Sequence, residues 1–125
     1  MDDRARKEAG EAAENAALKH LITRGLKLVA RNYRCRGGEL DLIMLDGKTL
    51  ALIEVRYRSS DDYGGASASV TWFKQRRIVL AARHLLAAQG HLRRYPARFD
   101  VIAVGGVLDR APRIEWIKSA FVVDR

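Results

Sequence analysis

The sequence has little cysteine, little proline and no long apolar run. Cys35 is its single cysteine among 125 residues, which excludes an internal disulfide framework and a zinc cluster built on cysteine. No stretch approaches the roughly 18 consecutive apolar residues of a membrane-spanning helix, and the first residues lack the apolar segment of a signal peptide. We therefore expect a soluble, cytoplasmic protein with no membrane partner.

Acidic residues are outnumbered by basic ones. The chain has 15 Asp and Glu against 23 Lys and Arg, for a formal net charge of +8 and an isoelectric point of about 10.1. This excess favours an anionic partner, most commonly nucleic acid, although many basic domains use their charge only for solubility. The length and the 48% of hydrophobic residues fit one compact domain over residues 1–125. A homodimer is compatible with this composition, which does not determine the oligomeric state.

The hydrophobic pattern predicts two helices. Residues 1–8 are mostly charged and are expected to form a disordered tail. Apolar residues recur every three or four positions over residues 9–24, which predicts an amphipathic helix ending near Gly25. A second helix is predicted over residues 71–88, with Gly90 ending it. The residues expected on its buried side are Phe73, Ile78, Ala81, Ala82 and Leu85.

Predicted strands are the segments rich in apolar and β-branched residues: 26–33, 39–45, 50–57, 98–104 and 113–117. The second and third of these form a β-hairpin around the turn at 46–49. The last one is short and is expected at a sheet edge. The polar, glycine-containing stretch 58–69 is predicted to be a loop. The predicted order is α-β-β-β-α-β-β, which describes an α/β fold.

The hairpin carries two acids whose relative placement depends on the turn. Side chains alternate along a strand, so Asp41 shares a face with Ile43, and Glu54 shares a face with Leu52. A two-residue turn would place Asp41 opposite Leu52 and diagonal to Glu54, whereas a four-residue turn would place it directly opposite Glu54. Either even-numbered turn puts both carboxylates on one side of the sheet, and an odd-numbered turn separates them.

Such a pair of acids predicts a nearby cation. Neighbouring carboxylates repel each other by up to about 1 kcal/mol in a sheet, so a fold that keeps them together needs compensation. Carboxylate oxygens suit Mg²⁺ or Mn²⁺, particularly where a phosphate completes the coordination. The alternative is that Glu39 and Arg56 pair with the two acids on a solvated sheet face. Spacing alone leaves both interpretations open.

Glu14 is a third acid of interest. It lies four residues before Leu18 and seven before Leu21, which places it on or beside the apolar stripe of the first helix. A carboxylate directed inward is costly unless it is paired or bound to a metal ion. The alternative is a boundary position from which the carboxylate reaches water.

Several short motifs occur in order between residues 13 and 104: Ala13-Glu14-Asn15 with Ala17, Arg31-Asn32-Tyr33-Arg34, Gly38–Ile43, Ile53–Arg58, Tyr63-Gly64-Gly65, Lys74-Gln75 with Arg77, and Arg98–Val101. Together they resemble the YraN-like family of small bacterial proteins. That family is similar to the PD-(D/E)XK, or restriction-endonuclease-like, superfamily and, in the arrangement of its acids, to archaeal Holliday junction resolvases. The resemblance implies an α/β core in which a three-stranded antiparallel meander and further strands form a mixed sheet flanked by helices.

The resemblance also implies roles for individual residues. Asp41 would be the first metal ligand and Glu54 the second, with Mg²⁺ or Mn²⁺ as cofactor. Glu14 would be the helical acid that approaches the metal in resolvase-like members. Arg56 occupies the position of the motif's lysine, and because arginine stays protonated it cannot act as a general base. Chemistry would then depend on water activated by the metal.

Basic and polar residues around these acids are expected to contact the phosphates of nucleic acid, most simply DNA. The residues singled out are Arg34, Arg36, Arg58, Lys74, Gln75 and Arg77. By the resemblance, Lys74 and Gln75 also correspond to an auxiliary polar position that many of these nucleases have. Trp72 and Tyr63 could stack on an unpaired base, although each is more often a packing residue. The three histidines have no metal-ligand spacing and are expected to be ordinary surface or boundary residues.

Two functions from different classes follow. The first is a metal-dependent endonuclease that hydrolyses phosphodiester bonds, with branched or structured DNA as its substrate. Its catalytic residues would be Asp41, Glu54, Arg56 and Glu14. The second is a non-catalytic nucleic-acid-binding module that retains the nuclease fold, and the arginine in place of the motif's lysine favours it.

Overall fold

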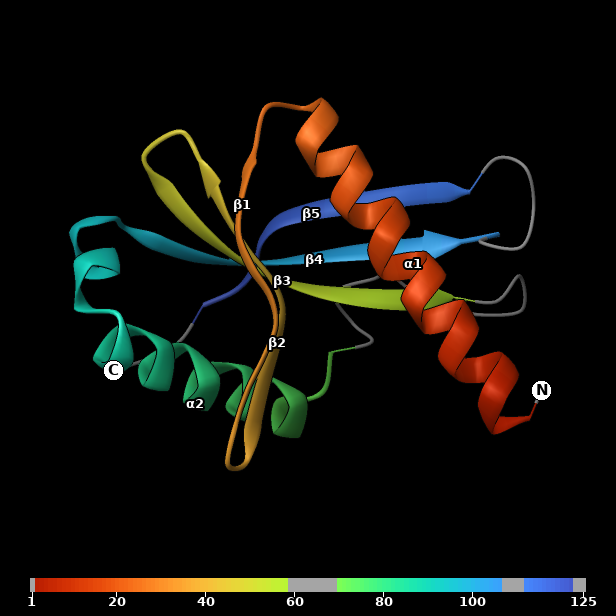
Figure 1. Ribbon diagram of the computed structural model, residues 1–125, viewed down its shortest axis with the longest axis horizontal. Coiled ribbons are helices and arrows are strands. Elements are labelled where there is room, and N and C mark those ends of the chain that lie inside the picture. Colours follow the sequence, from red (N-terminus) through yellow and green to blue (C-terminus); the bar gives the residue numbers. More distant parts are fainter. Residues whose placement is uncertain (1, 59–69, 107–111, 123–125) are drawn as a thin grey trace.

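The computed structural model describes residues 2–58, 70–106 and 112–122. Its elements are α1 (Asp3–Thr23), β1 (Lys27–Cys35), β2 (Gly38–Asp46), β3 (Thr49–Arg58), α2 (Trp72–Ala88), the short 3-10 helix η2 (Gly90–Arg94), β4 (Ala97–Gly105) and β5 (Arg113–Phe121) (Figure 1). This order confirms the predicted α-β-β-β-α-β-β. Most of the predicted loop, residues 59–69, lies outside the described residues. No helix in the described part of the chain is long and apolar enough to cross a membrane.

A five-stranded mixed sheet forms the centre of the fold, with strand order β1-β2-β3-β4-β5. β1, β2 and β3 form the expected antiparallel meander, β4 runs parallel to β3, and β5 pairs antiparallel with β4. α2 belongs to the connection between the parallel strands β3 and β4, as a parallel crossover requires. β5 lies at an edge, as predicted for the strand that begins at Arg113, but it continues to Phe121.

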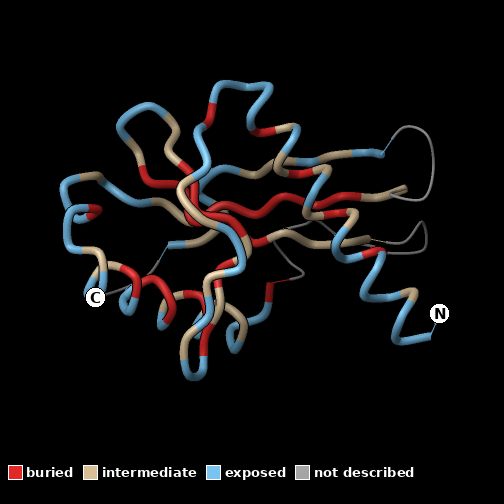
Figure 2. Tube along the Cα trace, viewed as in Figure 1, coloured by how far each residue is buried: buried red, intermediate tan, exposed pale blue. Residues whose placement is uncertain are grey.

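The two helices α1 and α2 pack on opposite faces of the sheet. Leu52 and Val101 share one hydrophobic core with apolar residues of α2, whereas Ile53 and Ile102 share another core with apolar residues of α1. Because side chains alternate along a strand, Glu54 has the same parity as Leu52 and faces the α2 side. Figure 2 shows the buried residues concentrated in the central strands and on the helix faces that meet them.

α1 begins earlier than the sequence predicts. Asp2 caps its N-terminus, and the Asp2 carboxylate accepts a hydrogen bond at 2.7 Å from the backbone N–H three residues later. Arg4 and Glu8 form an ion pair at 3.5 Å on the helix surface. The prediction of a disordered tail over residues 1–8 is therefore wrong for residues 3–8. A cap and surface ion pairs stabilise a first turn without apolar residues, so hydrophobic periodicity does not reveal it.

α2 has nearly the predicted bounds, and its cap Thr71 accepts a hydrogen bond from the N–H of Lys74 at 3.2 Å. Its buried residues are Ile78, Ala81, Ala82 and Leu85, as predicted. Phe73 is instead 74% exposed, so its assignment to the buried side is wrong. At 3.6 residues per turn, the five-residue separation places Phe73 roughly 140° around the helix from Ile78.

Gly38, the first residue of β2, determines how closely α2 approaches the sheet. A Cβ atom at Gly38 would collide with the carbonyl oxygen of Arg77 and come within 2.9 Å of the backbone nitrogen of Ala81. Both are backbone atoms of α2, so they can move aside only if the helix moves. The lack of a side chain at Gly38 therefore allows α2, with Lys74 in its first turn, to lie directly against β2.

We expect Gly38→Ala to lower the free energy of unfolding by about 1–3 kcal/mol, the usual effect of overpacking a close contact. Urea denaturation followed by circular dichroism measures this change. Gly10→Ala is the matched control, because Gly10 lies within α1 and a Cβ there meets nothing within 4 Å. That substitution should stabilise the protein by about 0.5–1 kcal/mol. Equal effects at the two glycines would contradict this account of α2 packing.

Candidate functional site

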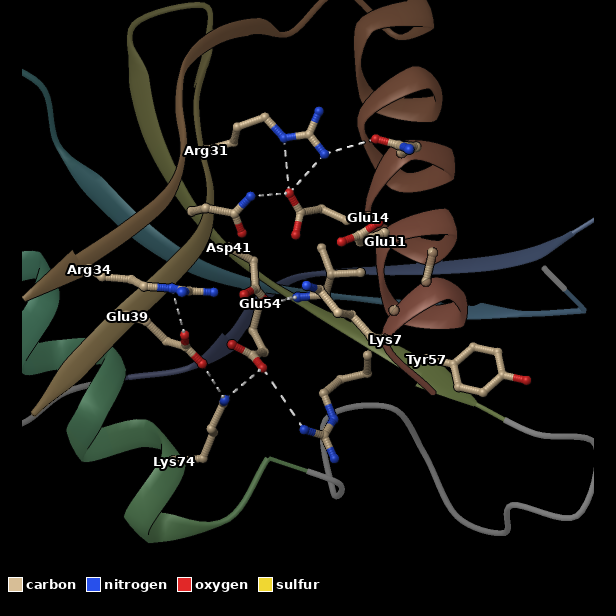
Figure 3. Close-up of a pocket in the computed structure, with 16 residues that line it drawn as sticks. Lys7, Glu11, Glu14, Arg31, Arg34, Glu39, Asp41, Glu54, Tyr57 and Lys74 are labelled. Carbon is tan, nitrogen blue, oxygen red and sulfur yellow. Dashed lines mark hydrogen bonds and ion pairs between the residues drawn. The ribbon is translucent and has the colours of Figure 1, made fainter. Parts of the chain in front are cut away.

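A cleft of about 570 Å³ lies between α1, the β1–β3 meander and the first turn of α2. Figure 3 shows the charged side chains that point into it. Its acidic lining residues are Glu11, Glu14, Glu39, Asp41 and Glu54, and its basic ones are Lys7, Arg31, Arg34, Arg56 and Lys74. The fold thus gathers charges of both signs from segments that are far apart in the sequence.

The hairpin turn brings the two predicted metal ligands to one side of the sheet. Asp46 pairs with Thr49, which leaves a two-residue loop, and the antiparallel pairing continues up to the residues just before the two acids. Extended by one residue, this register sets Asp41 opposite Glu54, the arrangement predicted for a four-residue turn. The arrangement predicted for a two-residue turn, with Asp41 opposite Leu52, is wrong because Leu52 pairs with Ile43. Both acids line the cleft. The N–H of Val55 donates a hydrogen bond to Asp41 Oδ2 at 2.8 Å, which holds this carboxylate against β3.

Glu54 is a buried acid with incomplete hydrogen bonding. Its side chain is 3% exposed, and its Oε1 lies 3.4 Å from Lys74 Nζ and 3.9 Å from Arg56 Nη1. Its other oxygen, Oε2, is buried and has no hydrogen-bond partner within the described part of the chain. Buried polar atoms are nearly always paired, so an unpaired one indicates a missing ligand, ion or water.

Burial raises the pKa of both carboxyl groups in this pair, and neighbouring negative charges add to its effect. For Glu54, burial contributes most and the charge of Asp41 adds to it, while Lys74 and Arg56 oppose the shift; the resulting pKa is about 8. Burial also raises the pKa of Asp41, against the opposing hydrogen bond from Val55. At neutral pH the metal-free pair therefore holds a proton that a bound cation would displace.

Lys74 joins two of the acids from the α2 side. Its Nζ lies 3.3 Å from Glu39 Oε1 and 3.4 Å from Glu54 Oε1. Burial alone would lower the pKa of this ammonium, but the charges of Glu54 and Glu39 outweigh burial and raise the pKa. Lys74 therefore stays protonated at neutral pH. The sequence predicted Lys74 as a phosphate contact at an auxiliary position, and in the structure it also contacts the second predicted metal ligand.

The sequence left open an alternative in which Asp41 and Glu54 pair with neighbouring side chains on a solvated sheet face. The structure does not agree with that alternative. Glu39 pairs with Lys74 and lies 3.6 Å from Arg34 Nε. As a negative charge it cannot neutralise the hairpin pair, and its repulsion helps to raise the pKa of Asp41. Arg56 does approach Glu54, as that alternative supposed, but Glu54 is buried and one of its oxygens is left unpaired. A single arginine at this distance does not complete the surroundings of the carboxylate.

Glu14 lines the cleft from α1 and is held by residues of β1. Its Oε1 accepts hydrogen bonds from Arg31 Nε at 2.9 Å and Asn32 Nδ2 at 3.0 Å, and Arg31 Nη2 also donates to Asn15 Oδ1 at 2.8 Å. Its side chain is 13% exposed, so of the two positions that the sequence left open, the inward and paired one is found. Asn32 had no predicted role, and its φ of +54° lies in a region where asparagine is enriched. That conformation becomes visible only in the structure.

The remaining predicted contacts divide between the cleft and other surfaces. Arg34 lines the cleft, but Arg36, Arg58, Gln75 and Arg77 are not among its described lining residues. Gln75 and Arg77 instead line a groove on the outer side of α2. Tyr63 lies outside the described residues. Contact of all these residues with nucleic acid stays a prediction.

The donor set fits an ion that keeps open coordination positions. In the segments that the structure describes, no group of three or more Asp, Glu, His or Cys side chains is arranged to hold a metal ion. Mg²⁺, however, is commonly bound by one or two carboxylates, with water and substrate phosphate completing its coordination. The unpaired oxygen of Glu54, in the cleft that Asp41 also lines, supplies the chemistry that such an ion needs. That the two acids share one ion stays a prediction.

Comparison with known proteins identifies relatives across most of the chain. Residues 13–104 match the family described as "Uncharacterised protein family UPF0102". The chain is 50% identical over 113 residues to a UPF0102 protein of Pseudomonas putida, which covers 90% of this chain and 91% of that protein. It is 47% identical over 117 residues to a UPF0102 protein of Saccharophagus degradans, covering 94% and 95% of the two chains. These matches agree with the motif resemblance to YraN-like proteins, and the chain belongs to the UPF0102 family.

Proposed function

We propose that the cleft binds nucleic acid and hydrolyses phosphodiester bonds with a divalent metal ion. The observation that carries this proposal is the buried Glu54 carboxylate with one unpaired oxygen, in a cleft that Asp41 and Lys74 also line. Because burial of the charged form is costly, the metal-free pair holds a proton at neutral pH, and the unpaired oxygen is open to a cation that displaces this proton. The net charge of +8 supports attraction of a polyanion toward the protein.

Asp41 and Glu54 would hold the ion, Mg²⁺ or Mn²⁺. When bound, such an ion lowers the pKa of a coordinated water and neutralises charge on a phosphate. Lys74 and Arg56 are both cations beside Glu54, and neither serves as a general base, because the pKa of Lys74 is raised and arginine keeps its proton. We assign to both cations the stabilisation of negative charge that develops on the phosphate.

Glu14 has a positioning role in this proposal. Arg31 and Asn32 engage its Oε1, so the carboxylate orients the Arg31 guanidinium on the wall of the cleft. An oriented guanidinium can contact a phosphate with two N–H groups. Arg31 and Arg34 would then guide the substrate backbone toward the acids.

DNA with branched or unpaired segments is the substrate that the resemblance to junction resolvases favours. The second candidate function is a non-catalytic nucleic-acid-binding module on the same fold. Arg56 supports it, because the residue that activates or orients water in the superfamily motif is replaced here by one that cannot accept a proton. Metal binding separates the two, since only the first function requires an ion.

Calorimetric titration of Mg²⁺ or Mn²⁺ tests the proposed site. We expect heat that saturates at about one ion per chain, and Asp41→Asn should weaken binding by at least about tenfold because one of the two ligands loses its charge. Glu8→Gln is the control, because it removes one negative charge from the exposed surface of α1 at a residue that is not among those lining the cleft. Absence of ion uptake by the wild-type protein, with and without an oligonucleotide, would overturn the nuclease proposal.

A further inference from the structure

α2 exposes two adjacent aromatic side chains in its first turn. Trp72 is 61% exposed and Phe73 is 74% exposed, and their rings meet edge to face with centroids 5.2 Å apart. Large aromatic side chains normally gain stability from burial, so a contiguous exposed pair indicates a contact surface. Neither ring is needed for the core, because α2 packs on the sheet through other residues.

Around this pair the surface of α2 is basic. The two aromatic residues line a groove of about 1000 Å³ together with Arg76, Arg77 and Arg83. The Arg76 guanidinium lies 4.8 Å from the centre of the Trp72 ring, within cation–π range. The described lining contains no acidic residue, and α2 itself has none. Among the described residues, the groove therefore combines aromatic faces with positive charge.

This combination fits single-stranded nucleic acid better than other occupants. Bases of a single strand stack on aromatic side chains while arginines contact the backbone, whereas the bases of a duplex are already stacked on each other. A second copy of the chain is disfavoured, because a two-fold interface places the same patch on both partners and would set arginine against arginine.

The position of the groove relates it to the cleft. Lys74 directly follows Phe73 in α2, and consecutive residues of a helix point about 100° apart. Lys74 Nζ contacts Glu54 in the cleft, whereas Trp72 and Phe73 line the outer groove. The cleft and the outer groove therefore lie on different sides of the first turn of α2. One nucleic-acid chain that passes this turn can contact both surfaces.

We propose that Trp72 and Phe73, with the arginines of α2, form a stacking platform for unpaired nucleotides, separate from the acidic cleft. The platform binds two or more unpaired bases and their phosphates. The selection of substrates rests on the proposed function. Together with the cleft, the platform selects substrates in which a single-stranded segment adjoins the bond to be cleaved. Binding to the platform itself requires neither metal nor cleavage.

Fluorescence anisotropy with a labelled twelve-nucleotide oligothymidine, in a chelator and at low salt, tests the platform. We expect Trp72→Ala and Phe73→Ala each to weaken binding by about 5- to 100-fold, as loss of one stacking partner does. Trp72→Phe should retain most of the affinity because it keeps an aromatic face. Ile22→Ala is the control, since Ile22 is also an exposed apolar residue, 51% accessible, but lies on α1. Circular dichroism melting curves confirm that these exposed substitutions leave the fold intact.

The same variants measured on a blunt duplex separate stacking from simple charge attraction. Duplex affinity should change less than about twofold in Trp72→Ala, because phosphate contacts alone are not sensitive to an aromatic face. The platform proposal would be overturned if Trp72→Ala and Phe73→Ala both bound oligothymidine with wild-type affinity, or if they lost equal affinity for single strand and duplex. A concentration-dependent dimer that is detected by sedimentation velocity and abolished by Phe73→Ala would also overturn the proposal, because the patch would then be a self-association surface. Since the assay contains no metal, failure of the nuclease proposal would leave this result unaffected.

Discussion

Asp41→Asn and Glu54→Gln are each expected to reduce metal-dependent cleavage by at least about 100- to 1,000-fold, the range seen when one electrostatic contact to a developing charge is removed. Each substitution keeps the shape of the side chain but removes a negative charge that would hold the ion. The measurement is single-turnover cleavage of an end-labelled four-way DNA junction by excess protein in Mg²⁺ or Mn²⁺. Wild-type rates in either variant would contradict the assignment of the cleft as the catalytic site.

The two cations beside Glu54 provide matched comparisons in the same assay. Arg56→Lys should retain or raise the rate, because lysine restores the superfamily's residue and keeps the charge. Lys74→Met should slow cleavage strongly, because it removes an ammonium 3.4 Å from Glu54, and Lys74→Arg should recover part of the loss. Protein that binds DNA but cleaves nothing, both as wild type and as Arg56→Lys, would favour the binding module.

Glu54→Gln is also expected to stabilise the metal-free protein at alkaline pH, by up to about 5 kcal/mol at pH 9, since each pKa unit between the unfolded and folded values corresponds to about 1.4 kcal/mol. The pKa of Glu54 in the folded protein is about 8, against an ordinary value of 4.5. Between these values the folded state holds a proton that the unfolded chain has lost. The free energy of unfolding therefore falls as pH rises from about 4.5 to 8, and glutamine removes this contribution.

Urea denaturation of both proteins in a chelator between about pH 3.5 and pH 9 measures this difference. The two curves should meet only below the ordinary pKa of 4.5, where the glutamate is protonated in the folded state and in the unfolded chain alike. Addition of Mg²⁺ at pH 9 should stabilise the wild-type protein more than the variant, because an ion that binds only the folded state adds to its stability. Parallel curves for the two proteins across this range would show that Glu54 does not titrate as described.

Local patterns in the sequence carry much of the fold and part of the site. Hydrophobic periodicity depends only on residues a few positions apart, so the order of helices and strands and the buried face of α2 were predictable. The same holds for Asp41 and Glu54, because they lie in one hairpin and strand alternation determines their faces once the turn is even. The tail was mispredicted because a helix cap and surface ion pairs leave no hydrophobic periodicity. Phe73 was mispredicted although its five-residue distance from Ile78 already turns it away from the buried side of α2.

The sequence by itself therefore determined the element order and placed the two acids in one hairpin, and only the structure decided the turn that puts them on one side and what surrounds them. Lys74 lies on a separate element, and its contact with Glu54 depends on the close approach of α2 to β2 at Gly38. Burial of Glu54, its unpaired oxygen and its raised pKa arise from packing between elements distant in the chain. Such packing depends on three-dimensional contacts that no short sequence pattern specifies, which is why the charge balance of the cleft emerged only with the fold.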